Sequence, residues 1–238
     1  MKRLLLLPAA LLGIGLAAFQ YVPVPFTKTA SAGPLVQSKS TGNAFASTLA
    51  YTSTVTSGNI LYAAIRDGGA SGDSITFTDS QSNTWTTEAA AYLPSDGDTV
   101  AIGCATAGST AADTVTFKVN GSASSVAGAI MEVHSANATC TLDATAVSNN
   151  QSATSCNSNN VTTLTANDFL VGMCGLATGT TTIAAGTNWS NGITAGISST
   201  NQSLLMETQV AVTTGNYAAT SGTFTSTENT AIVAPFKQ

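Results

Sequence analysis

Short segments in which apolar and polar residues alternate recur from about residue 45 to the end of the chain. They include residues 75–78, 100–105, 114–119 and 204–210. Successive side chains of a strand point to opposite faces, so this period indicates short strands. Turn-forming pairs such as Asn120-Gly121 and Ser221-Gly222 bound the segments. Beyond the first residues of the chain, no segment has the period of an amphipathic helix of ten or more residues.

About ten short strands separated by turns predict an all-β protein. We expect a single antiparallel β-sandwich, jelly-roll-like in its strand order, over residues 45–238. Two smaller sandwiches would need a linker, for which the polar stretch Ser135–Asn160 is the best candidate. Because that stretch carries Cys140 and Cys156, it is better interpreted as a disulfide-tied loop within one domain. No internal repeat of fixed period is detectable.

The first 32 residues have the pattern of a signal peptide. Lys2 and Arg3 precede an apolar run from Leu4 to Phe19, and Ala30-Ser31-Ala32 forms a small-x-small cleavage site. The alternative, an uncleaved membrane anchor, is disfavoured because the run is short and contains Pro8. The sequence therefore predicts a secreted protein, extracellular or at the cell surface. Residues 33–44 then form an extended leader, either disordered or exchangeable between molecules as an added strand.

Charged residues make up 8% of the chain, against roughly 25% in an ordinary domain. Cleavage after residue 32 leaves 12 acidic residues and four basic ones, and the basic ones are Lys39, Arg66, Lys118 and Lys237. Such a surface has no basic patch for nucleic acid or anionic lipid. We therefore expect no nucleic-acid partner, and no membrane partner after signal cleavage.

Four cysteines all lie in the predicted exported part: Cys104, Cys140, Cys156 and Cys174. An even number of cysteines in an oxidising compartment predicts disulfides. Three pairings are possible. The favoured one joins Cys140 to Cys156, which closes a polar loop, and Cys104 to Cys174, which links two strands. A zinc site is not expected, because the chain has a single histidine and no C-x-x-C.

Catalytic candidates are few. His134 is the only histidine and, by strand parity, shares a face with Glu132. Acid–base catalysis by this pair would need a nucleophile or substrate beside it, and the sequence indicates neither. There is no G-x-S-x-G, and a glycosidase would need two acids flanking an aromatic cleft. We therefore expect the protein not to be an enzyme, and no catalytic residue is assigned.

Two groups of residues are candidates for ligand binding. Acidic turns between strands supply the oxygen ligands that Ca²⁺ prefers. The candidate calcium ligands are Asp67, Asp73, Asp96 and Asp98. Exposed aromatic rings are the usual platforms for sugars in sandwich domains, and here the candidates are Tyr92, Trp189 and Tyr217. No other cofactor is expected.

Five segments, in order, resemble an uncharacterised group of secreted bacterial β-sandwich domains. They are residues 56–60 (TSGNI), 79–86 (DSQSNTWT), 166–172 (ANDFLVG), 186–189 (GTNW) and 231–237 (AIVAPFK). The likeness runs from about residue 45 to the end. It implies a fold and an export route, and it carries no catalytic role.

Two functions follow from these observations. The first is a non-catalytic extracellular structural or adhesive protein, a matrix, fibre or surface component whose partner is itself. A weakly charged surface lacks the repulsion that keeps strand edges apart. The alternative is a carbohydrate-binding module, calcium-assisted, whose partner is an extracellular polysaccharide.

Overall fold

The computed structural model describes residues 35–42, 46–69, 73–93, 97–121, 126–177, 183–195 and 203–238. The predicted signal peptide lies outside these ranges. The described residues form antiparallel strands and one short 3₁₀ helix, η1, at Ser135–Asn137. The strands are β1 (Leu35–Ser40), β2 (Thr48–Ala50), β3 (Ile60–Asp67), β4 (Ser74–Asp79), β5 (Thr86–Leu93), β6 (Asp98–Thr106), β7 (Thr114–Asn120), β8 (Val126–Val133), β9 (Val147–Ala153), β10 (Val161–Thr162), β11 (Asp168–Leu176), β12 (Ser190–Ala195), β13 (Ser203–Ala211), β14 (Asn216–Tyr217) and β15 (Thr227–Phe236).

The first eight strands have the nested pairing of a jelly roll. The sheet with order β1-β8-β3-β6-β5 is here called sheet A, and the sheet β2-β7-β4 is called sheet B. Strand 1 therefore pairs with 8, 2 with 7 and 3 with 6, as expected when a long hairpin folds over on itself. β5 hydrogen-bonds to β6 and also lies beside β4, where the Thr87 hydroxyl donates to the Ile75 carbonyl over 3.0 Å.

The remaining strands repeat this order. β9 to β15 form a five-stranded sheet, sheet C, with order β9-β15-β11-β13-β12, and a short sheet D of β10 and β14. In sheet C the first strand, β9, pairs with the last, β15. β15 pairs with the third strand, β11, and β11 pairs with β13 of the hairpin β12–β13, so the order matches that of sheet A. In place of a regular fourth strand, Ala185 makes a single bridge to Ser221. The protein therefore consists of an N-terminal half (residues 35–133) and a C-terminal half (residues 147–238) of the same topology.

Equivalent residues in the two halves confirm the match. Gly58 and Asn167 both have positive φ, 86° and 69°, just before the third strand of their half. Their backbone N–H groups donate to equivalent carbonyls, those of Ala107 and Ala211, over 2.7 and 2.6 Å. The fifth strand of each half, β5 or β12, begins directly after a tryptophan and then shifts its register within a few residues. The separation of equivalent residues shortens along the chain, so the sequence shows no fixed period.

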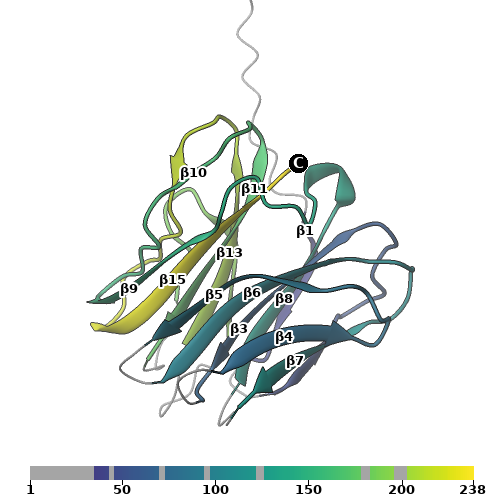
Figure 1. Cartoon of the computed structure of the whole chain (residues 1–238), viewed down its shortest axis with the longest axis horizontal. Helices are drawn as coiled ribbons and strands as arrows, with labels where there is room; N and C mark the ends of the chain where they lie inside the picture. The colour runs from purple at the N-terminus through teal and green to yellow at the C-terminus, as the bar shows by residue number, and fades with distance from the viewer. Residues whose placement is uncertain are drawn as a thin grey trace, which may run out of the picture.

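The halves pack through their five-stranded sheets (Figure 1), with sheet B and sheet D on the outside. β1 and β8 lie against β12, while β9 and β15 lie against β5. The first and last strands of each half thus contact the fifth strand of the other half, as at the interface of a two-fold symmetric dimer. The edge strands of the two large sheets therefore pack against each other across the interface.

Sheets A and C are buried on both faces, which explains why β3, β8 and β11 contain no exposed residue. One face of sheet A meets sheet C around Tyr62, whose ring lies 5.5 Å from that of Phe169. The other face meets sheet B, and there small residues are required. A Cβ at Gly103 or Gly128 would overlap the ring of Phe77 or Phe117, respectively. Alanine and glycine between the larger apolar residues thus let a second layer approach closely.

The predicted all-β, antiparallel sandwich is confirmed, with a second jelly-roll unit where one had been expected. The leader predicted over 33–44 contains a strand, since β1 pairs with β8 at the edge of sheet A. The stretch considered as a linker does lie between the two halves. Its central part is nevertheless ordered, because residues 139–143 hydrogen-bond to the end of the chain at Pro235 and Lys237.

All four cysteines form disulfides, as predicted, but the favoured pairing is wrong. The bonds are Cys104–Cys140 and Cys156–Cys174. The side chain of Cys104 lies in the core between sheets A and C, whereas that of Cys174 lies on the opposite, outer face of sheet C. Cys174 therefore meets Cys156 in the covering loop, and Cys104 meets Cys140 in the connection between the halves.

Candidate functional site

A surface pocket of about 390 Å³ opens at one end of the N-terminal half. It lies between the turn that joins β4 to β5 and the end of β6. Its walls come from three parts of the chain: Ser82, Asn83 and Thr84 in the turn, Thr106 and Gly108 after β6, and Cys140 in the connection between the halves.

The carboxylate of Asp79 holds the turn in place. It accepts hydrogen bonds from the backbone N–H groups of Gln81 and Asn83, at 3.1 and 3.0 Å. Its second oxygen accepts from the Asn83 amide and from the Trp85 indole N–H, both at 2.7 Å. A carboxylate that gathers the N–H groups following it is the usual way in which aspartate fixes a tight turn. Ser82 lies at its tip with a positive φ of 57°.

Two cross-links fasten the turn to the rest of the pocket. The Asn83 side-chain oxygen accepts from the Gly108 N–H over 2.8 Å, which joins the turn to the segment after β6. The Cys104–Cys140 disulfide anchors the third wall to β6. Below the turn, the Trp85 ring stacks on Phe77 at 5.7 Å. The pocket walls are therefore fixed before any ligand arrives.

The chemistry of the lining is neutral and polar. Ser82, Thr84 and Thr106 are exposed, and each presents a hydroxyl group that both donates and accepts. None of the lining residues is ionisable, since Cys140 is in a disulfide. The pocket therefore offers hydrogen bonds without a charge, a nucleophile or an acid–base group.

Glu132 and His134 occupy different environments. Glu132 is fully buried and accepts from the Gln37 amide at 2.6 Å, the Asn59 amide at 2.6 Å and the Thr56 N–H at 2.8 Å. It thus joins β1 and the loop before β3 to β8. His134 is exposed, and its Nδ1 accepts from the Ala136 N–H at the start of η1. The two side chains do not meet in a cleft.

The three aromatic candidates do not form one surface. Trp189 is only 8% exposed, and its indole N–H donates to the Ala218 carbonyl over 3.0 Å. Tyr217 is part-exposed on β14, and its hydroxyl donates to the Thr213 carbonyl over 2.7 Å. Tyr92 is on β5 in the other half, where its carbonyl accepts from the Asn150 amide of β9 over 2.6 Å.

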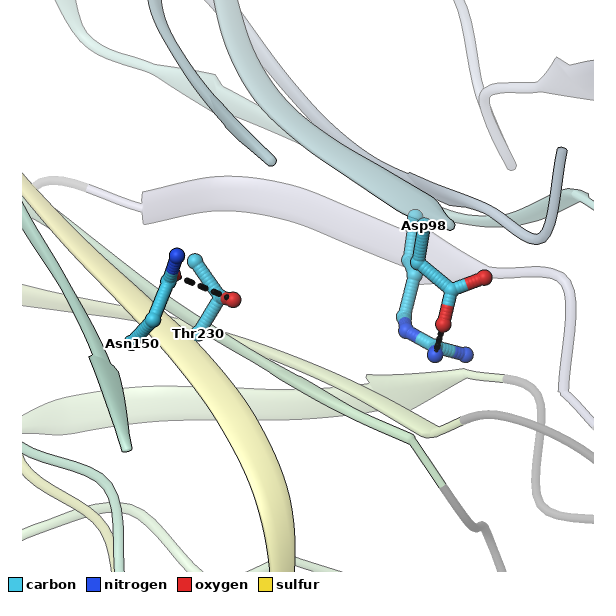
Figure 2. A network of polar contacts seen from close by, with 4 residues as sticks. Asp98, Asn150 and Thr230 are labelled. Carbon is cyan, nitrogen blue, oxygen red and sulfur yellow. Dashed lines mark hydrogen bonds and ion pairs between the residues drawn. The ribbon is translucent and has the colours of Figure 1, made fainter. Parts of the chain in front are cut away.

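The four acidic candidates for calcium binding likewise do not form one site among the described residues. Asp98 forms an ion pair with Arg66 in the interface between the halves (Figure 2). Close by, the Thr230 hydroxyl contacts Asn150, which itself bonds to β5. Asp67 is buried; burial and the neighbouring Asp73 raise its pKa to about 6. Asp96 lies outside the described residues. Within the described ranges, no three His, Cys, Asp or Glu side chains gather in a way that could hold a metal.

Three further acids with shifted pKa values lie in or beside the C-terminal half, away from the pocket. Burial raises the pKa of Glu207 on β13 to about 8, against the opposing effect of hydrogen bonds from the Gly186 and Thr220 backbones. Burial also raises the pKa of Asp168 to about 6, while Asp143, which accepts from the Leu164 and Thr165 N–H groups, has a lowered pKa. Shifted pKa values of this kind make the stability of the fold depend on pH.

Sequence reasoning missed the pocket, although it quoted the turn. The segment DSQSNTW entered the sequence analysis only through its resemblance to secreted β-sandwich domains. The carboxylate four residues before Asn83 was the available signal. The walls from Thr106 and Cys140 depend on tertiary structure and on the disulfide pairing.

Two further findings concern helices that could span a membrane and the likeness of the chain to known proteins. Among the described residues, no helix has the length and hydropathy that crossing a bilayer requires. No protein-family model, curated protein or solved structure matches the chain.

Proposed function

We propose that the protein is a non-catalytic, extracellular structural or adhesive component. The observation that carries this proposal is the chemistry of the exposed strand positions. In the described strands most of these are hydroxyl or amide side chains, the others are small or apolar, and Lys118 is the one charged residue among them. Such faces hydrogen-bond readily and repel one another little, which suits close contact with copies of the chain or with a hydrated polymer. Two disulfides support the extracellular location.

The arrangement of the edges favours contact through faces. The edge strands of sheet A pack against those of sheet C, β1 against β12 and β5 against β9, so each edge strand is partly covered by the other half. The exposed residues of β4, Ser74 and Thr76, and those of β9, Ser148 and Ser152, are available without any rearrangement.

Light scattering on the oxidised protein over a range of concentrations tests the proposal. We expect the mass to rise with concentration, with little effect of salt, because few charges lie on the strand faces. Two variants place like charges on these faces: Ser74→Glu with Thr76→Glu, and Ser148→Glu with Ser152→Glu. At least one pair should lower the mass at high concentration. A monomer at every concentration, or association that neither pair weakens, contradicts the proposal.

Carbohydrate binding is the second candidate, and the neutral pocket favours it. The support comes from Ser82, Thr84 and Thr106 rather than from the three rings first considered. A calcium contribution stays a prediction for Asp67 and Asp73, which lie close together. A calcium-dependent rise in melting temperature that Asp73→Asn removes would confirm it, and no rise would exclude it.

A further inference from the structure

We propose that the pocket at the β4–β5 turn binds an uncharged sugar unit, through the hydroxyl groups of Ser82, Thr84 and Thr106. The inference rests on the second candidate of the proposed function, carbohydrate binding, to which it adds a site and a class of ligand. It does not involve the aromatic residues that the sequence suggested.

The residues that line the pocket disfavour anionic and apolar ligands. An anion would require a basic side chain or a cluster of free N–H groups, but the Gly108 N–H is already bonded to Asn83. A wholly apolar ligand would require large aromatic or aliphatic walls, whereas the apolar surface of this pocket comes from small groups such as the threonine methyls and the disulfide. A ligand rich in hydroxyl groups, by contrast, both donates to and accepts from serine and threonine hydroxyls.

The pocket is also built to keep its shape. Four hydrogen bonds to Asp79 hold the turn, and the Asn83 bridge and the Cys104–Cys140 disulfide hold the other walls. Fixed walls reduce the entropy that binding must otherwise overcome. The left-handed backbone of Ser82, rare for residues other than glycine and asparagine, gives a reason to look for function at that position.

The second half of the chain supplies an internal comparison. Ile60 pairs with Thr106 in the first half, and its equivalent Phe169 pairs with Val210 in the second. By the same alignment Gly108 corresponds to Val212, which is 44% exposed. The C-terminal half thus has valines where the pocket has a hydroxyl and an open glycine. The wall after β6, at Thr106 and Gly108, is therefore specific to the N-terminal half, whereas the equivalent turn of the C-terminal half keeps polar residues at Thr187 and Asn188.

Saccharide titrations of the oxidised full chain test the inference. The probes are the methyl glycosides of glucose, galactose, mannose and N-acetylglucosamine, with glucuronic acid and glucosamine as charged comparisons. The readout is the indole N–H resonance of Trp85, because its donor bond to Asp79 couples it to the turn. The resonance of Trp189, which lies in the other half, is the internal control. Trp189→Phe assigns the two signals.

We expect at least one neutral glycoside to shift the Trp85 signal and not the Trp189 signal. Thr84→Val with Thr106→Val should weaken that binding tenfold or more, since two hydrogen bonds are lost without a change of shape. Thr76→Val, an exposed threonine of β4 outside the pocket, should leave affinity unchanged. Thermal unfolding of each variant checks that the fold is intact.

Three results would overturn the inference: no shift with any neutral glycoside, binding that the double variant leaves unchanged, or tighter binding of the charged sugars. The mass from light scattering separates this failure from that of the proposed function. If the protein associates but binds no sugar, the structural function is supported and the pocket proposal is wrong. If a strict monomer binds sugar, the pocket proposal is supported and the structural function is wrong.

Discussion

At the residue scale, the closest packing in the protein depends on glycines within strands. Gly103 and Gly128 lie on the face of sheet A that meets sheet B, where two phenylalanine rings occupy the space of their missing side chains. The alternation pattern marked these strands correctly but treated alanine and glycine as filling between larger residues. It could not show that both faces are buried, because that depends on sheets formed by residues far away in the chain.

Gly128→Ala should therefore destabilise the protein by about 1–3 kcal/mol, because the new methyl group must displace the Phe117 ring. Denaturant unfolding measures the effect. Gly215→Ala is the matched control, since its Cβ would meet Tyr217 at an ordinary 3.7 Å. Adding Phe117→Leu should restore part of the loss from Gly128→Ala. Equal effects of the two glycine substitutions would contradict the packing described.

Glu207 gives a second prediction at this scale. Its pKa is raised from 4.5 to about 8, so the folded state holds a proton there that the unfolded state releases. The resulting stabilisation is complete below pH 4.5 and is lost as the pH rises through 8. Glu207→Gln should therefore gain stability relative to the unmodified protein between pH 5 and pH 9. The difference should reach on the order of 4 kcal/mol, and unfolding free energies at several pH values measure it. A difference independent of pH would be incompatible with this assignment.

At the element scale, a buried carboxylate organises the start of the N-terminal half. Glu132 accepts hydrogen bonds from β1 and from the loop before β3, and so connects three segments. The sequence placed Glu132 and Ile130 on one face, and they do share it. Its surroundings were not predictable, because Gln37 belonged to a segment interpreted as a leader. The weak alternation of β1 hides a strand that is paired on one side only.

Glu132→Ala should destabilise the protein by on the order of 3 kcal/mol, because it leaves three donors without their acceptor. Hydrogen exchange should quicken at Thr56, whose N–H loses its acceptor, and across β1, while protection in sheet C stays unchanged. Mass spectrometry of the exchanged protein resolves these regions. His134→Ala, which removes only the acceptor at the start of η1, is the comparison. Uniform loss of protection in both halves would show that Glu132 has no local role.

The segment that forms the turn of the pocket was singled out from the sequence, but its role as a pocket wall was not predicted. The segment from Asp79 to Trp85 stood out by its resemblance to secreted β-sandwich domains. Local sequence thus predicted one wall. The other walls depend on how β6 and the connection at Cys140 are brought together, and the favoured cysteine pairing had placed Cys140 elsewhere.

At the scale of the whole molecule, acidic groups with raised pKa values occur in both halves. Asp67 and Asp168 both have a pKa of about 6, above the ordinary 3.8, and Glu207 follows at about 8. A raised pKa of an acid means that stability is greatest below the ordinary value and declines as the pH passes the raised one. These three groups therefore act in the same direction.

We expect the melting temperature to be higher near pH 5 than near pH 8, by several degrees. Calorimetry in buffers of constant ionic strength measures the difference. Asp67→Asn with Asp168→Asn should reduce the change that occurs below about pH 6, leaving the part due to Glu207, which continues to about pH 8. A maximum at alkaline pH would mean that these carboxyl groups ionise normally in the folded protein.

The contact between the two halves also contains an asymmetry. Arg66 of β3 lies over Gly175 of β11, and these residues occupy equivalent positions in their halves. In a dimer of identical subunits, two arginines or two glycines would meet at this place, giving either repulsion or a void. Joining the units in one chain removes that restriction, since a substitution then appears once instead of twice. One half can therefore carry a cation at this position while the other leaves room for it, and in the same way Thr106 of the pocket can have a valine, Val210, as its counterpart.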